Sequence, residues 1–171
     1  MPAGDTKMRA VCDICGFINY VNPKIVVGTL TTWRDRILLC RRAIEPRRGF
    51  WTIPAGYLEE HETTIDGALR ETREEAGVVP TIRALLAVYS VRRISQVQLI
   101  YQAIAETDEL VPGPETLEAR FFERQRIPWD ALAFPSVRWA IRHHDEVANA
   151  AVFAPRSNPE GDWGDERPAG L

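Results

Sequence analysis

The feature that most constrains this chain is the acidic run at residues 70–77, Arg-Glu-Thr-Arg-Glu-Glu-Ala-Gly. It lies at the end of a segment, residues 63–76, whose apolar residues recur at helical spacing. On a helix, Glu71, Glu74 and Glu75 occupy positions i, i+3 and i+4 and therefore share one face. Like charges at this spacing weaken a helix. The sequence thus predicts a helix that presents three mutually repelling carboxylates.

Two interpretations of this acidic face are open. In the first, the carboxylates bind a hard divalent cation, Mg²⁺ or Mn²⁺ in its place, which proteins hold through a few carboxylates together with substrate phosphates. In the second, the face is solvated and carries intrahelical ion pairs such as Arg70–Glu74. The helix by itself does not decide between them.

The surrounding segments predict an α/β (α+β) domain. Gly77 is suited to end the acidic helix, because glycine tolerates a left-handed backbone. Strand-like segments and a second helix complete the pattern; the strands are expected at 25–30, 37–40, 50–53, 82–91, 96–105 and 120–122, and the helix at 136–148. Strands interrupted by two helices predict a mixed β-sheet sandwiched between helices.

Composition predicts one domain with short extensions. We expect a leader at residues 1–20, a catalytic domain at 21–150 and a tail at 151–171, flexible from about Pro155 because it is rich in Pro, Gly and charge. No apolar run approaches the roughly 18 residues of a membrane span. With a net charge of −3 and scattered arginines, the chain has no basic stripe for nucleic acid. No signal-like stretch opens the chain, and three cysteines form no disulfide framework, so a cytoplasmic location is expected.

The acidic helix and the segment before it together resemble the Nudix box. That pattern runs Gly, five residues, Glu, seven residues, Arg-Glu, an apolar residue, any residue, Glu-Glu, any residue, Gly and an apolar residue. Its fixed positions match Gly56, Glu62, Arg70, Glu71, Glu74, Glu75, Gly77 and Val78. Thr72 departs from the usual aliphatic residue, and we expect its hydroxyl to bond the carbonyl of Ala68. The resemblance covers most of residues 10–145 and implies the Nudix fold.

The resemblance also implies roles in a magnesium-dependent hydrolase of diphosphate bonds. It assigns Glu71 and Glu75 to metal binding, Glu74 to a further metal or to a metal-bound water, and the carbonyl of Ala55 to the same shell. The structural positions of the box are Gly56 and Gly77, for their backbone conformations, and Glu62 and Arg70, as an ion pair that ties the loop to the helix.

Residues outside the box complete the predicted site. A general base is required, and Glu115 and Glu118 are the candidates. We favour Glu115, as base and metal ligand, because a carboxylate on a loop can reach across a site. Arg41 and Arg42 end a strand near the site, and either phosphate contact or simple solvation explains them.

The leader contains Cys12-x-x-Cys15-Gly16, which resembles half of a zinc ribbon. Structural zinc needs four ligands. A zinc ion completed by a neighbouring chain is one interpretation of Cys12 and Cys15, and a metal-free remnant is the other and the favoured one. Cys40 lies within a strand and is expected in the core.

The substrate is predicted by resemblance alone. Residues 87–96 lack the Ser-Gln-Pro-Trp-Pro-Phe-Pro array of the NADH pyrophosphatases. The leader and the segments Trp-Thr-Ile-Pro-Ala-Gly-Tyr-Leu-Glu, Pro-Gly-Pro-Glu and Leu-Ala-Phe-Pro-Ser are similar to plant-type FAD and ADP-ribose pyrophosphatases. Hydrolysis of FAD or ADP-ribose to AMP plus FMN or ribose 5-phosphate is therefore expected. Hydrolysis of NADH, NAD or another dinucleotide, and a non-catalytic metabolite sensor, are the alternatives. The resemblance also implies a homodimer that binds a small nucleotide, with no membrane partner.

Overall fold

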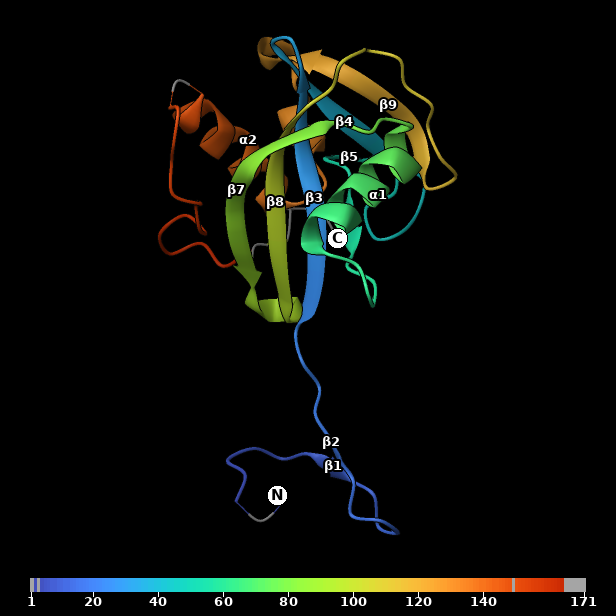
Figure 1. Cartoon of the computed structure of the whole chain (residues 1–171), viewed down its shortest axis with the longest axis vertical. Helices are drawn as coiled ribbons and strands as arrows, with labels where there is room; N and C mark the ends of the chain where they lie inside the picture. Colours follow the sequence, from blue (N-terminus) through green and yellow to red (C-terminus); the bar gives the residue numbers. More distant parts are fainter. Residues whose placement is uncertain (1, 3, 149, 165–171) are drawn as a thin grey trace.

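A computed structural model describes residues 2, 4–148 and 150–164 of the chain. Figure 1 shows a body of sheet and helices from which the leader, residues up to about 20, projects as a separate hairpin. The strands are β1 (Ala10–Val11), β2 (Ile18–Asn19), β3 (Lys24–Trp33), β4 (Arg36–Arg42), β5 (Trp51–Thr52), β6 (Ala55–Tyr57), β7 (Thr81–Val91), β8 (Gln96–Ile104) and β9 (Thr116–Glu123). The α-helices of the described residues are α1 (Thr64–Ala76) and α2 (Pro135–Val147), and neither is both long and apolar enough to cross a membrane.

The body is built on one mixed sheet. Five strands follow the order β5-β4-β3-β8-β7, while β6 also pairs with β3 and β9 with β4. The central β3–β8 pair is parallel, and the other pairs in this sheet are antiparallel. The leader strands β1 and β2 form their own antiparallel pair. The predicted mixed α+β architecture is confirmed.

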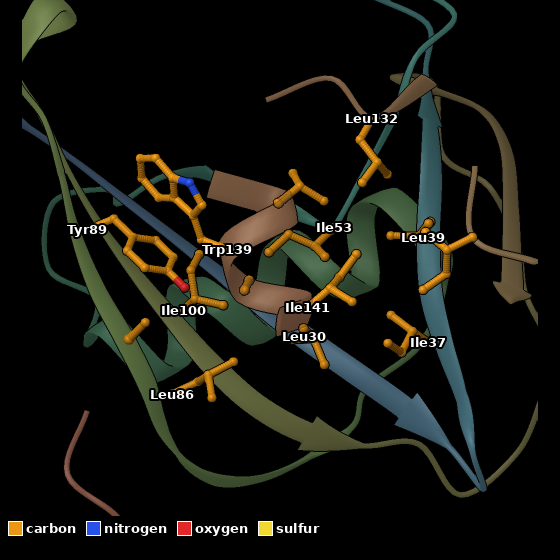
Figure 2. Packing of buried hydrophobic residues seen from close by; sticks show 14 of the residues in the cluster. Leu30, Ile37, Leu39, Ile53, Leu86, Tyr89, Ile100, Leu132, Trp139 and Ile141 are labelled. Carbon is orange, nitrogen blue, oxygen red and sulfur yellow. The ribbon is translucent and has the colours of Figure 1, made fainter. Parts of the chain in front are cut away.

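The side chains of each strand alternate between the two faces of the sheet, and each face packs against one helix. Successive strand residues point to opposite faces of a sheet. In β4, Ile37 and Leu39 pack into the cluster that α2 covers, whereas Leu38 and Cys40 pack with Ala76 at the end of α1. Figure 2 shows the larger cluster, in which Ile141 and Trp139 of α2 lie among side chains of the sheet. The sheet therefore lies between the two helices, with Cys40 in the core as expected.

Helix α1 is fixed at both ends and along its buried side. The Thr63 hydroxyl caps the N-terminus by accepting from the Asp66 amide at 3.1 Å, and Gly77 ends the helix with φ 74°. Thr72 donates to the Ala68 carbonyl at 2.8 Å, which confirms the predicted back-bond. Its hydroxyl also lies 2.7 Å from that of Thr29 on β3, a partner that the sequence did not indicate. The departure from an aliphatic residue is thus matched by a polar residue on the sheet.

Two strands differ from the sequence prediction. The segment expected at 50–53 contributes only β5, because Pro54 interrupts it, and the chain resumes as β6, which was not predicted. Strand β9 has eight residues, where three were expected at 120–122. The charged residues Glu118 and Glu123 on either side of the expected segment mask the alternation that identifies a strand. The other predicted strands and both helices agree with the structure to within three residues.

The segment before the end of the described chain departs from its expected flexibility. The backbone of Arg156 exchanges hydrogen bonds with Leu86 and Val88 on the outer edge of β7, at 2.8 and 2.9 Å. The side-chain amide of Asn158 then pairs with the backbone of β7, as a neighbouring strand would: it accepts from the Ser90 amide at 2.8 Å and donates to the Ser90 carbonyl at 3.1 Å. A sequence rich in Pro and Gly can still cover an exposed sheet edge, which otherwise invites aggregation. Residues 165–171 of the predicted tail lie outside the described residues.

Asn158→Ala tests this edge cover. The substitution removes the hydrogen bonds to Ser90 and one to the Asp162 carbonyl, so we expect a loss of roughly 1–2 kcal/mol in the free energy of unfolding. Urea denaturation measures the loss, and hydrogen exchange at the Ser90 amide should accelerate. Ser157→Ala, at an exposed neighbour, is the control. Unchanged exchange at Ser90 would contradict the assigned contact.

Candidate active site

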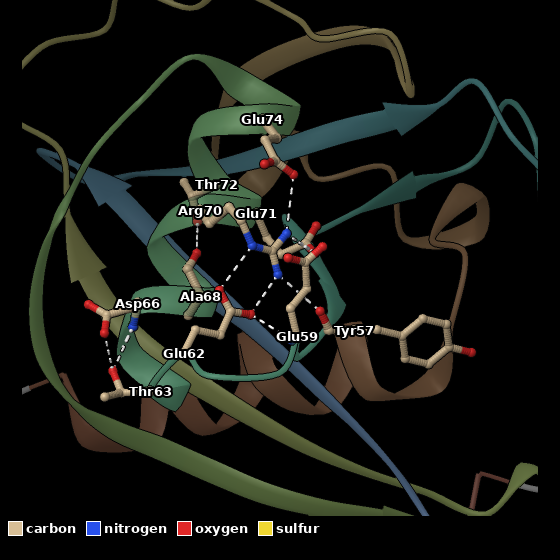
Figure 3. Close-up of polar contacts among 10 residues, drawn as sticks. All are labelled: Tyr57, Glu59, Glu62, Thr63, Asp66, Ala68, Arg70, Glu71, Thr72 and Glu74. Atoms are coloured by element: carbon tan, nitrogen blue, oxygen red, sulfur yellow. Dashed lines mark hydrogen bonds and ion pairs between the residues drawn. The ribbon is translucent and has the colours of Figure 1, made fainter.

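Arg70 of α1 is the centre of the site's ion-pair network, drawn in Figure 3. Its guanidinium forms a bidentate pair with Glu62, at 2.8 and 3.1 Å, and donates to the Tyr57 carbonyl at 3.0 Å. The Glu62 carboxylate also accepts from the Glu59 amide at 2.7 Å. The hydrogen bonds from Arg70 hold the pKa of Glu62 below its usual range. The ion pair expected between loop and helix is therefore present and fastens residues 57–62 to α1.

The same guanidinium reaches two carboxylates of the acidic face. Arg70 Nη1 lies 2.7 Å from Glu71 and 3.2 Å from Glu74. Glu71 is only 13% exposed, whereas Glu74 is 53% exposed. Burial raises the pKa of Glu71, and the charges of Glu74 and Glu115 add to this, although Arg70 opposes it. Glu71 is thus a carboxylate held in a site that does not fully compensate its charge.

Gly56 of β6 lies in close contact with the Glu71 carboxylate. A Cβ built on Gly56 would overlap the carboxylate of Glu71, so the β6 backbone lies directly against that side chain. Strand β6 is held there by antiparallel pairing of Gly56 with Val27 of β3. A glycine is required here for close approach.

Glu75 lies deepest in the cluster. One of its oxygens accepts from the Ala55 amide at 3.4 Å. The pKa of Glu75 is raised to about 8, chiefly by burial; the charges of Glu71 and Glu115 also raise it, whereas the Ala55 amide and Arg42 lower it. The carboxylates of Glu71 and Glu75 on α1 and of Glu115 before β9 therefore repel one another, and the guanidinium of Arg42 partly offsets this repulsion.

The structure separates the paired candidates outside the box. Glu115 acts electrostatically on Glu71 and Glu75, whereas Glu118 lies within β9, opposite Arg41. Arg42 acts on Glu75, while the exposed Arg41 donates to the Gly49 carbonyl at 2.9 Å. Glu115 and Arg42 thus belong with the acidic face.

The donor set suits a hard divalent cation, although the side chains are not gathered around one point. Within residues 2, 4–148 and 150–164, no three Asp, Glu, His or Cys side chains converge as metal ligands. Glu71 and Glu74 instead pair with Arg70, and Glu75 turns to the Ala55 amide. The fit is one of chemistry, because oxygen ligands of raised pKa are those whose charge a cation would stabilise. The metal-ligand roles of Ala55, Glu71, Glu74, Glu75 and Glu115 stay predictions.

Backbone groups of the site were missed by sequence reasoning. The Tyr57 carbonyl and the Glu59 amide complete the network around Arg70 and Glu62. Backbone groups are present at every residue, so no sequence signal marks those that take part. Of the tyrosines in the sheet, Tyr89 and Tyr101 are buried in the core, whereas Tyr57 is half exposed beside the network.

The leader cysteines adopt a turn suited to thiolate chemistry. Cys12 and Cys15 are exposed, and the Gly16 amide donates to the Cys12 carbonyl at 2.9 Å. Backbone hydrogen bonds from Cys15 and Ile14 lower the pKa of Cys12. No third ligand for zinc stands beside this pair within the described residues. Zinc binding by the leader stays a prediction.

A sheet between two helices, with partly buried carboxylates beside an arginine, has the donor chemistry of hydrolases that cleave phosphate bonds with divalent cations. Comparison with known families gives the assignment. The model described as "NUDIX domain" matches residues 22–143, and the one described as "Nudix N-terminal", a zinc-ribbon module, matches residues 1–21. The chain belongs to the Nudix hydrolase family, whose enzymes generally use divalent metal ions.

Individual relatives cover most of the chain. A crystal structure of a NUDIX hydrolase from Nitrosomonas europaea is 42% identical, covers 92% of this chain and 91% of that one, and superposes with a TM-score of 0.86. The ADP-ribose pyrophosphatase of Methanocaldococcus jannaschii is 31% identical over 67% of this chain and 69% of its own. The NAD-capped RNA hydrolase NudC of Stutzerimonas stutzeri is 33% identical over 74% of this chain, which spans 45% of that protein.

Glu75→Gln should stabilise the metal-free protein, most strongly at high pH. The pKa of Glu75 is raised from 4.5 to about 8, so the folded protein binds this proton more tightly than the unfolded chain does. Ionisation of Glu75 therefore does not affect the free energy of unfolding below about pH 4.5. Between pH 4.5 and 8 it lowers that free energy by roughly 1.4 kcal/mol per pH unit, and above pH 8 the loss is complete. In EDTA, the Tm advantage of the variant over the wild type should grow from pH 6 to 8.5.

Two controls accompany that measurement. Mg²⁺ should raise the Tm of the wild type far more than that of Glu75→Gln, and kcat of the variant should fall by orders of magnitude. Glu60→Gln, at an exposed position in the loop before α1, should change neither quantity. A variant less stable than the wild type at pH 8.5 would contradict the assigned burial of charge.

Proposed function

We propose that this Nudix hydrolase is a magnesium-dependent pyrophosphatase of ADP-ribose or of FAD, releasing AMP together with ribose 5-phosphate or FMN. The observation that carries the chemistry is the set of three glutamates on one face of α1, of which Glu71 is 13% exposed beside Arg70 and Glu75 accepts from the Ala55 amide. The substrate rests on a relative, the M. jannaschii ADP-ribose pyrophosphatase, of which this chain spans more than two thirds. FAD stands beside ADP-ribose because both consist of an AMP unit joined through a diphosphate.

Arg70 prepares the site before any ligand arrives. It holds Glu71 and Glu74 by ion pairs and the loop by Glu62 and Tyr57. Binding of a cation by Glu71 and Glu74 would replace these ion pairs, because both carboxylates face Arg70. Divalent ions bound by Glu71, Glu75 and Glu115, with Glu74 and the Ala55 carbonyl, would supply charge neutralisation of the diphosphate and a water of lowered pKa.

Hydrolysis breaks one P–O bond of the bridge. Glu115 accepts a proton from the attacking water, whose oxygen bonds to one phosphorus as the bridging oxygen leaves with the other phosphate. Glu115 is favoured over Glu118 because its charge acts on both Glu71 and Glu75. Arg42 attracts the diphosphate, since its guanidinium is the cation outside α1 that acts on Glu75.

NAD(H) or an NAD-capped RNA end is the second candidate. Relatives named NAD-capped RNA hydrolase match up to 84% of this chain, and the leader matches a zinc-ribbon model. Such a substrate shares the AMP unit and the diphosphate, and its cleavage releases nicotinamide mononucleotide instead of ribose 5-phosphate. The identity of the product therefore separates the two candidates.

A substrate panel tests the proposal. The protein is incubated with Mg²⁺ and ADP-ribose, FAD, NADH, diadenosine polyphosphates or NTPs, and the products are identified by chromatography. We expect AMP with ribose 5-phosphate or FMN, at the highest kcat/KM of the panel, and no turnover in EDTA. Faster release of nicotinamide mononucleotide from NADH would favour the second candidate. Tight binding without turnover would indicate a sensor and refute the enzymatic proposal.

Arginine variants test phosphate binding. Arg42→Ala should raise KM at least about tenfold, the effect of losing one charge-assisted contact of 1.5–3 kcal/mol. Both arginines donate from Nε to a backbone carbonyl, Arg41 to Gly49 at 2.9 Å and Arg42 to Pro46 at 2.8 Å. Arg41→Ala should have a smaller effect, because Arg42 is the one of the two whose charge acts on Glu75. Arg142→Ala, exposed on α2 across the sheet, controls for net charge. If Arg41→Ala were the more damaging change, the assignment of Arg42 would be wrong.

A further inference from the structure

The loop between β8 and β9, residues 105–115, binds the C-terminal end of the acidic helix and is called here the capping loop. Figure 1 shows it in yellow as it passes around the end of α1. The last carbonyls of a helix have no partner within the helix. Here the Val111 amide donates to the Ala76 carbonyl at 2.8 Å, and the Gly113 amide donates to the Glu75 carbonyl at 3.3 Å. A segment more than thirty residues further along the chain therefore caps the helix.

Gly113 makes the closest of these contacts. A Cβ built on Gly113 would overlap the carbonyl oxygen of Glu74, which is backbone and cannot swing away as a flexible side chain can. No left-handed φ is recorded for Gly113, so close approach rather than backbone conformation selects glycine. Any larger residue must lift the capping loop from the helix.

The capping loop ends at Glu115, two residues beyond this contact. The Glu115 carbonyl accepts from the Ala43 amide at 2.8 Å, and the Thr116 amide donates back to the Gly113 carbonyl at 3.0 Å. The backbone around Glu115 is thus tied to α1 on one side and to the residue after Arg42 on the other. Leu110 adds an apolar anchor, packed on the cluster of Leu38, Cys40 and Ala76.

We propose that Gly113 is a positioning residue for Glu115: by letting the capping loop seat on the carbonyl end of α1, it sets where the Glu115 carboxylate lies relative to Glu71 and Glu75. The proposal rests on the role given to Glu115 above. Its physical basis is that one helix carries both the carboxylates at the site and the carbonyls that receive the loop. A shift of the loop therefore becomes a shift of Glu115 against fixed partners.

A double-mutant cycle tests this coupling. The full-length wild type, Gly113→Ala, Glu115→Gln and the double variant are compared with ADP-ribose, or with the panel substrate turned over fastest. Gly113→Ala should lower kcat by roughly 10- to 100-fold, as misplacement of a catalytic group by about 1 Å does. KM for the nucleotide should change little, and half-saturation should require more Mg²⁺. The double variant should be no slower than Glu115→Gln, because both changes remove the same interaction.

Gly161→Ala is the matched control. Gly161 has φ 76° and nothing within 4 Å of an added Cβ, so alanine there strains the backbone without displacing a neighbour. It should lower Tm and leave kcat unchanged. Should Gly113→Ala fail to fold by circular dichroism, Leu110→Ala loosens the same loop without a clash and should lower kcat in the same way, again only while Glu115 is present.

The outcomes separate the two hypotheses. If Glu115→Gln is slow but Gly113→Ala matches the wild type, or if the two effects multiply in the double variant, the coupling is refuted and the role of Glu115 stands. If Glu115→Gln itself is as active as the wild type, the role of Glu115 in the proposed function is refuted.

Discussion

The crowding of carboxylates at one end of α1 is the constraint on which the rest of the site depends. Glu71 and Glu75 are partly buried against the sheet and β6, and both have a raised pKa. Burial of like charges opposes folding unless neighbouring groups compensate. Arg70 compensates only in part, since it pairs with Glu71 and Glu74 but not with Glu75. The fold therefore retains a local instability where a cation and an anionic substrate would be bound.

Other parts of the fold hold α1 against this repulsion. Thr63 caps its start, the hydroxyls of Thr72 and Thr29 join it to the centre of the sheet, and the capping loop closes its far end. The opposite face of the sheet holds the large cluster around Ile141 and Trp139 under α2, together with polar contacts such as that between Tyr89 and His143 at 2.8 Å. The largest apolar cluster of the described residues thus lies on the α2 face, while the box carboxylates lie on the α1 face. Such a division is expected where a functional site must be rigid and yet locally unfavourable.

The sequence predicted those parts that leave a periodic or spaced pattern in side chains. The extent of α1 and the Thr72 back-bond follow from spacing, and the Glu62–Arg70 pair follows from the resemblance to the Nudix box; the structure contains all three. Strand β6 and most of β9 escaped prediction, because pairing with β3 and β4 makes strands of segments that have little alternation of their own. The contacts of Arg156 and Asn158 with β7 were also hidden, since composition reports flexibility but not a specific partner. For the site, the choice of Glu115 over Glu118 gained support only from three-dimensional proximity.

The box cannot by itself determine the substrate. Relatives that match this chain over the same region are named for ADP-ribose and for NAD-capped RNA. In the proposed function the box carboxylates act on the diphosphate through bound cations, and these substrates share that diphosphate. Discrimination would then come from groups that contact the rest of the molecule. Around the site, the half-exposed ring of Tyr57 and the Arg47–Phe50 stack, 4.0 Å from guanidinium to ring centroid, supply aromatic and cationic surfaces of that kind. The Arg47–Phe50 stack lies in the loop between β4 and β5, and Tyr57 ends β6 at a variable position of the box, so either can change without altering the sequence of α1.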